Sequence, residues 1–556
     1  MVGDPSDGEM RRHSSLVAAG IGLSRVSGLA RDAALAYFLG ANAGADAFRA
    51  ALKIPNFLQN LLGEGVLSAS FIPSFSRLLA DGRDEDAGRL AGAVLGMLIA
   101  LTGVLVLLGV LLARPLTLLI TPGFEGDKLE LTVTLVRIMF PGIGLLVISA
   151  WCLGVLNSHR RFFLSYVAPV VWNAGILAAL FGHGATLVLD PAIAAGWGVL
   201  LGGGLQVAVQ VPTVRRLLRG SMRLSVDRDA PGVRGVLRAF LPIVLGRGTV
   251  QLAALLDVVV ASLLATGALA VLGYAQTLYL LPIALFGMSV AAAELPSLSV
   301  RAGAELSHLR SRLDAGLARS AFFVIGTSVG YLLVGGGIVA LLFGRGEFDQ
   351  ATVVQVSLVL GVYALGLLPA TASRLLQSLL YAVDDARTPA RIAVIRVTIG
   401  LAIAVPLMFN LDQLVVDLSE PARVRLTEGG TLPNFAPVDP ALRGQDGNQL
   451  RLGALGLAIG SAFGAWLEFA LLRRAVGRRL HSPRLGGGTL ARLLAAAVVA
   501  SAAILVLGPQ LDDSPWVRVP VLGVVGGAVY VGVCAWRGVP EARELLRALP
   551  GRRGSS

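Results

Sequence analysis

Residues 91–111 read AGAVLGMLIALTGVLVLLGVL and contain no charged side chain. A helix of about twenty such residues is as long as the hydrocarbon core of a bilayer is thick. Stretches of this kind recur along the chain, which has 556 residues, 55% of them hydrophobic and 15% charged. Together with a mean hydropathy of +0.74, this composition is far from that of soluble proteins. The sequence predicts an all-α polytopic membrane protein.

About fourteen transmembrane helices are expected from windows of this length. The segments lie near 14–39, 45–76, 89–113, 129–156, 163–187, 192–218, 236–264, 268–300, 313–343, 351–382, 389–410, 451–477, 488–509 and 516–536. The second and eighth are long and carry proline pairs, Pro55 with Pro73 and Pro282 with Pro296. Each of these two is expected to be a kinked or two-part helix.

The distribution of basic residues predicts the orientation in the membrane. The net charge is +12, but Lys and Arg form short clusters after even-numbered segments, such as Arg160-Arg161 and Arg473-Arg474. The positive-inside rule explains this pattern without a nucleic-acid partner. Both termini, residues 1–13 and 538–556, are therefore expected in the cytoplasm, and the polar 411–450 loop outside. The polar start lacks a signal peptide's apolar core, so we expect the first span to be retained.

The two cysteines carry no site. Cys152 and Cys534 lie in apolar segments without metal-ligand spacing, and we expect both to be small buried hydrophobic residues.

An internal repeat predicts the domain organisation. Ile72-Pro73 matches Leu295-Pro296, Leu23-Ser24-Arg25 matches Leu245-Gly246-Arg247, and Phe140-Pro141 matches Leu368-Pro369, at offsets of 223, 222 and 228 residues. Each offset spans six segments, and an even number of spans preserves orientation. We expect two parallel six-helix lobes with a substrate cavity between them. The first lobe is 14–220, the second is 235–410 with 451–480, and two C-terminal helices occupy 486–537.

Cations inside the spans are the main indication of function. Arg25 and Arg31 lie in SRVSGLARD (24–32), and Arg247 lies in the seventh segment. A charge at the centre of a span costs roughly 2.5–3.5 kcal/mol on insertion scales, so such residues usually serve a cavity or a partner. An anionic ligand is therefore indicated. The alternatives for Arg25 and Arg31 are snorkelling at a helix end or a buried pair with Asp32 or Asp46.

A polar stripe follows in the second segment. Asp46, Arg49, Lys53 and Asn56 recur at three- and four-residue steps, which places them on one helix face. The stripe fits a cavity-lining helix, and an amphipathic interfacial helix would show the same pattern. Asp257 is a carboxylate in an apolar run, and it fits either an ion- or proton-coupling site or a counter-ion for Arg247.

Weaker candidates complete the set of charges. Glu294 and Arg374 are lesser candidates of the same kind as Asp257, and Glu468 is expected to pair with neighbouring arginines. Asp384-Asp385 resembles half of a prenyltransferase magnesium site, but the further aspartates that would complete it are absent. HExxH, nucleophile-elbow and P-loop motifs are also missing, so a transporter is favoured over an enzyme.

Four stretches resemble the MurJ (MviN) family of lipid II flippases, in the multidrug/oligosaccharidyl-lipid/polysaccharide exporter superfamily. They are SRVSGLARD (24–32), GADAFRAALKIPNFLQNLLGEGVLSASFIPSFS (44–76), LLFGRGEFD (341–349) and YAVDDARTPARIAV (381–394). The resemblance implies fourteen spans and a cationic cavity that binds the pyrophosphate of lipid II. Positions on the family pattern are Arg25, Arg31, Asp32, Asp46, Lys53, Asn56 and Glu64. Gln59-Asn60 and Gln276-Thr277 depart from it, because the family commonly has charged residues there.

The resemblance and the residues together predict a lipid II flippase of the bacterial cytoplasmic membrane that works by alternating access. The expected substrate-binding residues are Arg25, Arg31, Asp46, Arg49, Lys53, Asn56 and Arg247. Structural or gating roles are expected for Asp32, Glu64, Pro55, Pro73, Pro282 and Pro296. No cofactor is expected except a coupling monovalent cation such as sodium, at Asp257 or Asp385. The expected partners are lipid II and the bilayer, without nucleic acid, and the expected state is a monomer.

Two alternatives remain. One is a sibling exporter of polysaccharide-linked lipids or drugs, in which acidic cavity residues should dominate. The other is a membrane enzyme that acts on polyprenyl phosphates, which would need a carboxylate–metal cluster.

Overall fold

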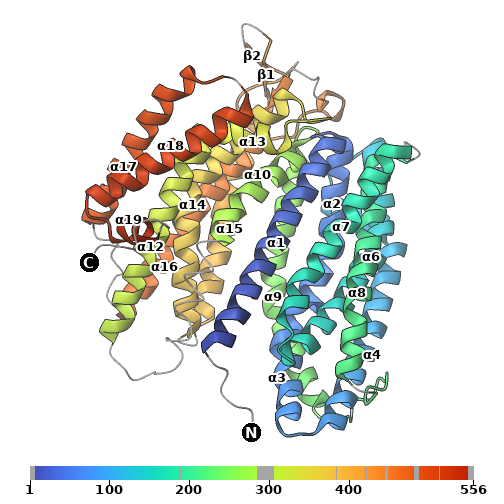
Figure 1. Ribbon diagram of the computed structural model, residues 1–556. Coiled ribbons are helices and arrows are strands. Elements are labelled where there is room, and N and C mark those ends of the chain that lie inside the picture. Colours follow the sequence, from blue (N-terminus) through green and yellow to red (C-terminus); the bar gives the residue numbers. More distant parts are fainter. Residues whose placement is uncertain are drawn as a thin grey trace. The chain divides into compact units, whose positions relative to one another are not determined.

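The chain divides into two compact units, residues 1–270 and 271–556. In the computed structural model (Figure 1), the described residues are 7–186, 189–218, 220–284, 306–382, 385–419, 423–427, 429–444, 449–480, 487–512 and 514–548. Nearly every element is a helix, as the apolar windows predict.

The first unit is an all-helical bundle. Its helices are α1 (Asp7–Leu39), α2 (Ala43–Leu62), α3 (Glu64–Ala80), α4 (Asp84–Leu111), α5 (Ala113–Ile120), α6 (Gly126–Ser158), α7 (Phe162–Thr186), α8 (Pro191–Leu217) and α9 (Val233–Ala261). Helix α6 is the most buried of the long apolar helices and packs against α2, α4 and α8. Its Trp151 and Leu156 join Phe71 and Phe75 of α3 and Leu90 of α4 in one apolar core.

Glycine allows α7 and α8 to approach closely. A Cβ added at Gly175 of α7 would lie 2.5 Å from the Cα atom of Gly202 on α8. Small residues are how membrane helices pack backbone to backbone, because no hydrophobic effect drives them together within lipid. Helices α7 and α8 therefore pack tightly against each other.

The predicted two-part second segment is observed, but the break lies at Gly63 and not at a proline. Pro55 lies inside α2 and Pro73 inside α3. A Cβ at Gly63 would lie 2.3 Å from the Gln59 carbonyl oxygen, which accepts the Gly63 N–H at 2.7 Å. Prolines are tolerated in membrane helices because neighbouring groups satisfy the freed carbonyls, so the break falls where only glycine fits.

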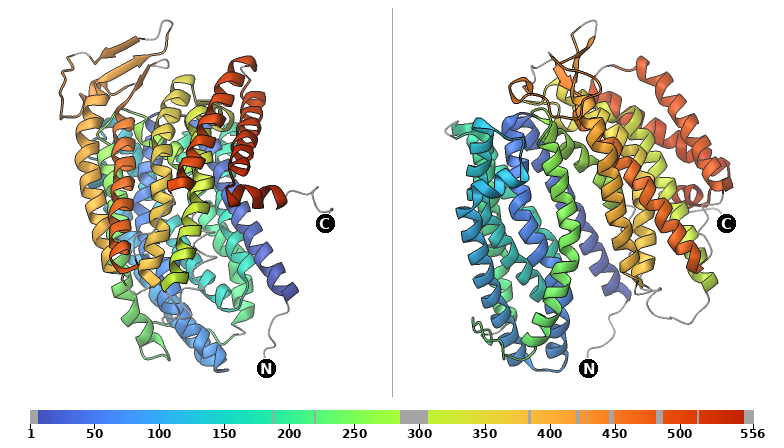
Figure 2. Two further views of the ribbon diagram at one scale, coloured as in Figure 1. Left: turned by 90° about the vertical axis from the view of Figure 1, so that its left-hand side faces the viewer. Right: turned by 180° about the vertical axis from the view of Figure 1, so that it is seen from behind.

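The second unit contains most of α10 (Ala268–Pro282) and a second helical bundle. Its other helices are α12 (Leu306–Leu333), α13 (Gly335–Phe343), α14 (Gln350–Ala382), α15 (Arg387–Asp412), α16 (Gly453–Leu480), α17 (Gly487–Leu507), α18 (Pro515–Trp536) and α19 (Pro540–Ala548). Helices α15 and α16 lie side by side in both views of Figure 2. A Cβ at Gly460 of α16 would lie 2.6 Å from the Gly400 carbonyl oxygen of α15.

The 411–450 region, expected as a polar loop, forms a small antiparallel sheet with residues just beyond it. Its strands are β1 (Leu414–Asp417), β2 (Arg423–Leu426) and β3 (Gln449–Arg451), in the order β2-β1-β3. Val416 of β1 lies opposite Val424 of β2 and Leu450 of β3. Strands of three or four residues are too short for a periodicity signal, so the sequence did not indicate this sheet within the predicted loop.

Arg451 fixes this sheet to the second bundle. Its guanidinium donates to the carbonyls of Asp412 at 2.8 Å and Leu442 at 2.6 Å. The Arg451 carbonyl accepts from the Gln355 side chain of α14 at 2.6 Å. Burial lowers the pKa of Arg451, an effect that the charge of Asp412 opposes. The sheet is therefore attached to α14 and α15 by a largely buried arginine.

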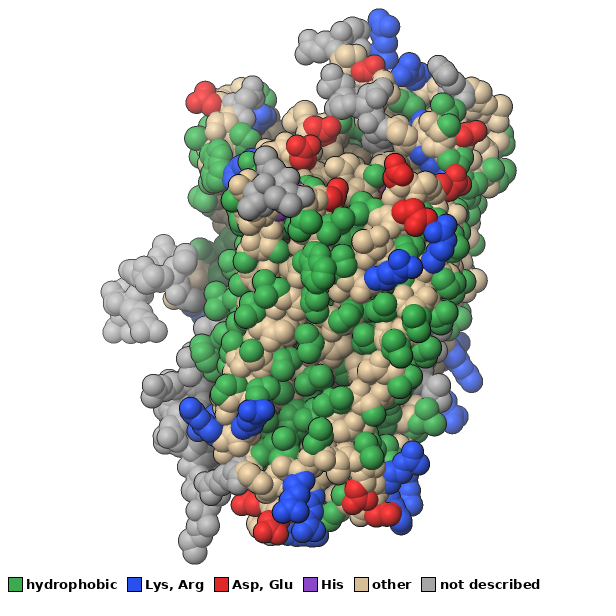
Figure 3. Space-filling model, turned by 90° about the vertical axis from the view of Figure 1, so that its right-hand side faces the viewer, with side chains coloured by type: hydrophobic (Ala, Val, Ile, Leu, Met, Phe, Trp, Pro, Cys, Tyr) green, Lys and Arg blue, Asp and Glu red, His purple; other side chains and the backbone are tan. Residues whose placement is uncertain are grey.

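The fold prediction is confirmed. Within the described residues, ten helices are long and apolar enough to cross a membrane: α4, α6, α7, α8, α12, α14, α15, α16, α17 and α18. Three of the other four predicted segments coincide with helices, namely α1, α2 with α3, and α9. The eighth, 268–300, begins with α10, and its part beyond residue 284, with the expected two-part form, lies outside the described residues. On the face in Figure 3, hydrophobic side chains cover the middle, and most charged side chains gather toward the two ends. This is the surface that a bilayer requires.

The boundary between the units falls later than the repeat predicts. The repeat places residues 235–264 in the second lobe, whereas α9 packs against α2 and α3 and belongs to the first unit. Membership of α9 in a second lobe rests on the repeat alone and stays a prediction. The predicted cytoplasmic tail contains helix α19.

Candidate functional site

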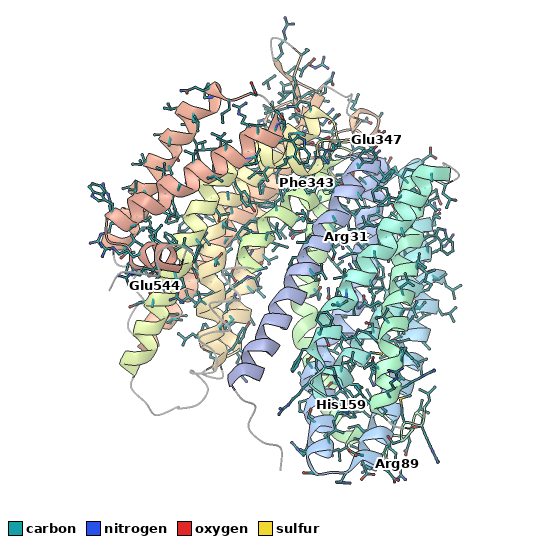
Figure 4. The ribbon with its side chains drawn as sticks, in the orientation of Figure 1. Arg31, Arg89, His159, Phe343, Glu347 and Glu544 are labelled. Carbon is teal, nitrogen blue, oxygen red and sulfur yellow. The ribbon has the colours of Figure 1, made fainter. Side chains whose placement is uncertain are left out.

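Arg31 lies on α1 (Figure 4), eight residues before its end at Leu39. A polar network within the first unit holds its side chain. Its guanidinium donates to Asp32 Oδ1 at 2.9 Å and to Asn173 Oδ1 of α7 at 3.1 Å. It also lies 5.4 Å from the centre of the Trp172 ring, a cation–π distance. Asn173 in turn donates to Ser27 Oγ at 2.9 Å. The pair with Asp32, one of the alternatives for Arg31, is therefore present, and it fixes the direction of the arginine.

Arg25 lies six residues earlier on α1, about 9 Å along the helix axis, and differs sharply from Arg31. Its side chain is exposed. Among the described residues it makes no hydrogen bond or ion pair. Arg25 is thus a cation within the first predicted span that a ligand can reach.

Asp46 is buried, and both oxygens of its carboxylate accept hydrogen bonds. Its Oδ2 accepts from the Lys128 ammonium at 2.7 Å and from the Gly267 N–H at 2.8 Å, and its Oδ1 accepts from the Ala270 N–H at 2.8 Å. Lys128 also lies 4.0 Å from the centre of the Phe124 ring. A carboxylate at a helix start satisfies unpaired N–H groups and the positive end of the helix dipole. The geometry therefore gives Asp46 the role of tying α2 to α6 and to the start of α10.

Beyond Asp46, polar residues of α2 lie near α9. Lys53 lies within electrostatic range of Arg49 on its own helix and of Asp257 on α9. Two turns further on, Asn60 donates to Gln251 of α9 at 3.1 Å. Helices α2 and α9 therefore meet along one seam, on which Lys53 is exposed. Lys53 is the cation that the described residues place near Asp257.

Other predicted site residues have different surroundings. Asp385 caps α15, because its carboxylate accepts from the Thr388 N–H at 3.0 Å and from the Thr388 hydroxyl at 2.7 Å. Asn56 is half-buried on α2, and Pro282 is the buried last residue of α10. The side chains of Glu64 and Arg247, and residues Asp384, Glu294 and Pro296, lie outside the described residues.

A second polar cluster lies in the second unit. Glu468 of α16 accepts from Arg396 of α15 at 2.7 Å and from Gln377 of α14 at 2.7 Å. The sequence predicts an arginine partner for Glu468 but points to its neighbours in the chain. The partner is 72 residues away, and the signal that could have identified it is that Arg396 is a cation inside an apolar stretch of α15. Within the described part of the chain, no three His, Cys, Asp or Glu side chains gather as a metal site.

Comparison with solved structures defines the class. The structure resembles an inward-facing multidrug resistance MATE transporter of the MOP superfamily, with a TM-score of 0.58 at 15% identity over 82% of this chain and 94% of that one. It also resembles lipid II flippase MurJ in an inward closed conformation, with a TM-score of 0.74 at 20% identity over 96% and 100%. The fold is thus that of a MOP-superfamily membrane transporter.

Sequence comparison defines the family within that class. The family model described as lipid II flippase MurJ matches residues 35–421. The probable lipid II flippase MurJ of Bdellovibrio bacteriovorus is 32% identical over 416 residues, 72% of this chain and 77% of that protein. The lipid II flippase MurJ of Burkholderia cenocepacia is 32% identical over 379 residues, 67% and 73% respectively. The chain belongs to the MurJ family, as its motifs predict, and it is a multi-pass protein of the inner membrane.

Proposed function

We propose that this chain translocates the peptidoglycan precursor lipid II across the cytoplasmic membrane. The observation that carries this proposal is the family match over residues 35–421, which includes most of the polar residues described above. The geometry adds support, because the first unit contains cations within its predicted spans. Lipid II carries a pyrophosphate, and arginine binds phosphate oxygens through paired, charge-assisted hydrogen bonds.

The cations of the first unit divide into two roles in this proposal. Arg25 and Lys53 are exposed and would contact the pyrophosphate. Arg31 is held in one conformation by Asp32 and Asn173. Its positive charge would therefore act on the substrate without a further loss of side-chain conformational entropy. Arg49 and Asn56 extend the same stripe of α2. Asp46 would act through its ties to Lys128 and α10, and not by contact with an anion.

The transport cycle in this proposal is alternating access, with the lipid tail remaining in the bilayer. A coupling monovalent cation such as sodium would bind at Asp257, because hard cations prefer carboxylate oxygens. Lys53 would then compete with that cation for the same carboxylate. Asp385 is the weaker candidate, since both of its oxygens already accept from Thr388. We also propose that both termini are cytoplasmic, from the arginine clusters.

Rescue of a bacterium depleted of its own lipid II flippase tests the proposal. Expression of this chain should restore growth and shape. The matched control is Arg25→Ala, expressed and inserted to the same level, which should not rescue. A correctly inserted chain that fails to rescue, in a host whose lipid II it can reach, would contradict the proposal.

A further inference from the structure

The polar cluster around Glu468 contains more positive than negative charge. Glu468 is buried, with 3% of its side chain exposed, and pairs with Arg396, which is 36% exposed. Arg374 lies one helical turn before Gln377 on α14, is exposed, and has no ion pair among the described residues. Arg396 therefore has a carboxylate partner, whereas Arg374 is a second cation one turn from the Gln377 that also contacts Glu468. Charged groups inside a membrane span are costly, so an unbalanced cation there indicates an anionic ligand.

Arg374 and Arg396 lie more than two turns from the ends of their helices. Arg374 is eight residues before the end of α14 at Ala382, and Arg396 is nine residues after the start of α15 at Arg387. At 1.5 Å per residue, these positions are about 12–14 Å from the helix ends. Neither arginine is therefore part of the last turn of α14 or the first turn of α15.

The geometry leaves donors available for a ligand. Arg396 directs Nη1 at Glu468, while its Nε and Nη2 make no hydrogen bond within the described residues. Tyr279 of α10 lies within electrostatic range of Arg374, Arg396 and Glu468, and its ring stacks near Tyr363, with 5.1 Å between the ring centres. Helix α10 itself carries no charged residue. The free guanidinium edges and the phenol hydroxyl are the donor types that bind phosphate oxygens.

We propose that Arg374 and Arg396, with Tyr279, form a phosphate-binding site in the second unit, which Glu468 and Gln377 hold in place. Its ligand is the phosphate of a lipid, either the pyrophosphate of lipid II or the headgroup of an anionic phospholipid. The first of these sources rests on the proposed function. Glu468 and Gln377 are positioning residues, because each contacts another protein side chain and fixes the direction of Arg396 or the spacing of α14 and α16.

Binding to the purified full chain in nanodiscs tests this site. The discs consist of phosphatidylcholine, and either lipid II or phosphatidylglycerol is titrated in and counted by native mass spectrometry. Arg374→Gln should weaken binding of one of these lipids by about tenfold or more, the loss expected for charge-assisted hydrogen bonds. Arg391→Gln is the matched control, because it removes one exposed arginine from α15 outside the cluster and should change neither affinity.

A second variant tests the contribution of the Arg396–Glu468 ion pair to lipid binding. Arg396→Gln alone would leave Glu468 as a buried unpaired charge and could prevent folding. The double variant Arg396→Gln with Glu468→Gln removes both charges and keeps the volume. It should fold and should lose affinity for the same lipid as Arg374→Gln. Unchanged affinity for both lipids in both variants would overturn the site.

The titrations with lipid II and with phosphatidylglycerol distinguish a failure of this phosphate site from a failure of the proposed function. Weaker binding of lipid II alone supports a substrate site, whereas weaker binding of phosphatidylglycerol alone supports a site for a bilayer lipid. If the unmodified chain fails to bind lipid II but loses phosphatidylglycerol on substitution, the proposed function falls and the phosphate site stands.

Discussion

The ammonium of Lys128 lies 2.7 Å from the Asp46 carboxylate, although 82 residues separate the two in the chain. The side chain of Asp46 is 2% exposed and that of Lys128 14%. Removal of one partner from a buried ion pair is strongly destabilising, because the other charge stays buried without compensation. The same carboxylate also accepts two backbone N–H groups at the start of α10, so this one side chain holds three segments of the first unit together.

Asp46→Asn should therefore lower the stability of the protein by about 3–5 kcal/mol, measured as a fall in melting temperature in detergent. Glu130→Gln is the matched control, since Glu130 lies on the same helix as Lys128 but forms an exposed pair with Arg114. That change should have little effect, because exposed pairs contribute about 0–1 kcal/mol. Equal melting temperatures for Asp46→Asn and the unmodified chain would show that the buried pair is not structural.

Arg25 and Arg31 should respond differently to substitution. Arg25→Ala should leave the melting temperature unchanged and abolish transport, because the Arg25 side chain is exposed. Arg31→Ala should lower both the melting temperature and the transport rate. Asp32 is only 4% exposed, and the substitution would remove the arginine with which its carboxylate pairs. Arg25→Lys should restore transport only in part, because a point charge lacks the guanidinium fork. Full transport by Arg25→Ala would remove that residue from the substrate site.

Asp257→Asn should weaken the dependence of transport on sodium or protons more than it weakens lipid II binding. The reason is that a neutral amide binds a hard cation less well than a carboxylate does. Transport and lipid binding would be measured across a sodium titration and a pH series in proteoliposomes. An unchanged ion dependence would leave Asp257 with the simpler role of counter-ion to Lys53, its cationic neighbour on α2.

Cysteine labelling should place the small sheet region outside the cell. The native Cys152 and Cys534 are buried, so a single introduced cysteine would dominate the signal. Phe435 is 66% exposed, and Phe435→Cys should react with a membrane-impermeant maleimide in intact spheroplasts. Arg387→Cys, at the start of α15, should react only after lysis. The reverse pattern would invert the orientation that the arginine clusters predict.

The sequence predicts the helices well because length and hydropathy are local properties. Each of the fourteen predicted segments coincides with helices over the residues that the structure describes, and the Arg31–Asp32 pair, one of the alternatives for Arg31, joins neighbours in the chain. Hydrogen-bond partners that are distant in the chain could not be predicted in this way. The Gly267 and Ala270 N–H groups that bind Asp46 lie more than 200 residues away, and backbone donors leave no trace in side-chain patterns.

The break at Gly63 shows a second limit. Proline is the residue that local rules select as a helix breaker, and the second segment contains two. The break instead follows from the contact between Gly63 and the Gln59 carbonyl, which depends on how the α2–α3 junction folds. Likewise, the arginine partner of Glu468 was expected near it in the chain, whereas tertiary packing of α15 against α16 supplies Arg396.

Translocation by the purified chain tests the central proposal most directly. Fluorescent lipid II would be placed in proteoliposomes of phosphatidylcholine and phosphatidylglycerol, with a membrane-impermeant reagent that quenches only the outer leaflet. The unmodified chain should make nearly all of the label accessible, while Arg25→Ala and empty liposomes should leave about half protected. Protection that is equal with the unmodified chain and with empty liposomes would contradict the assignment of lipid II translocation to this protein.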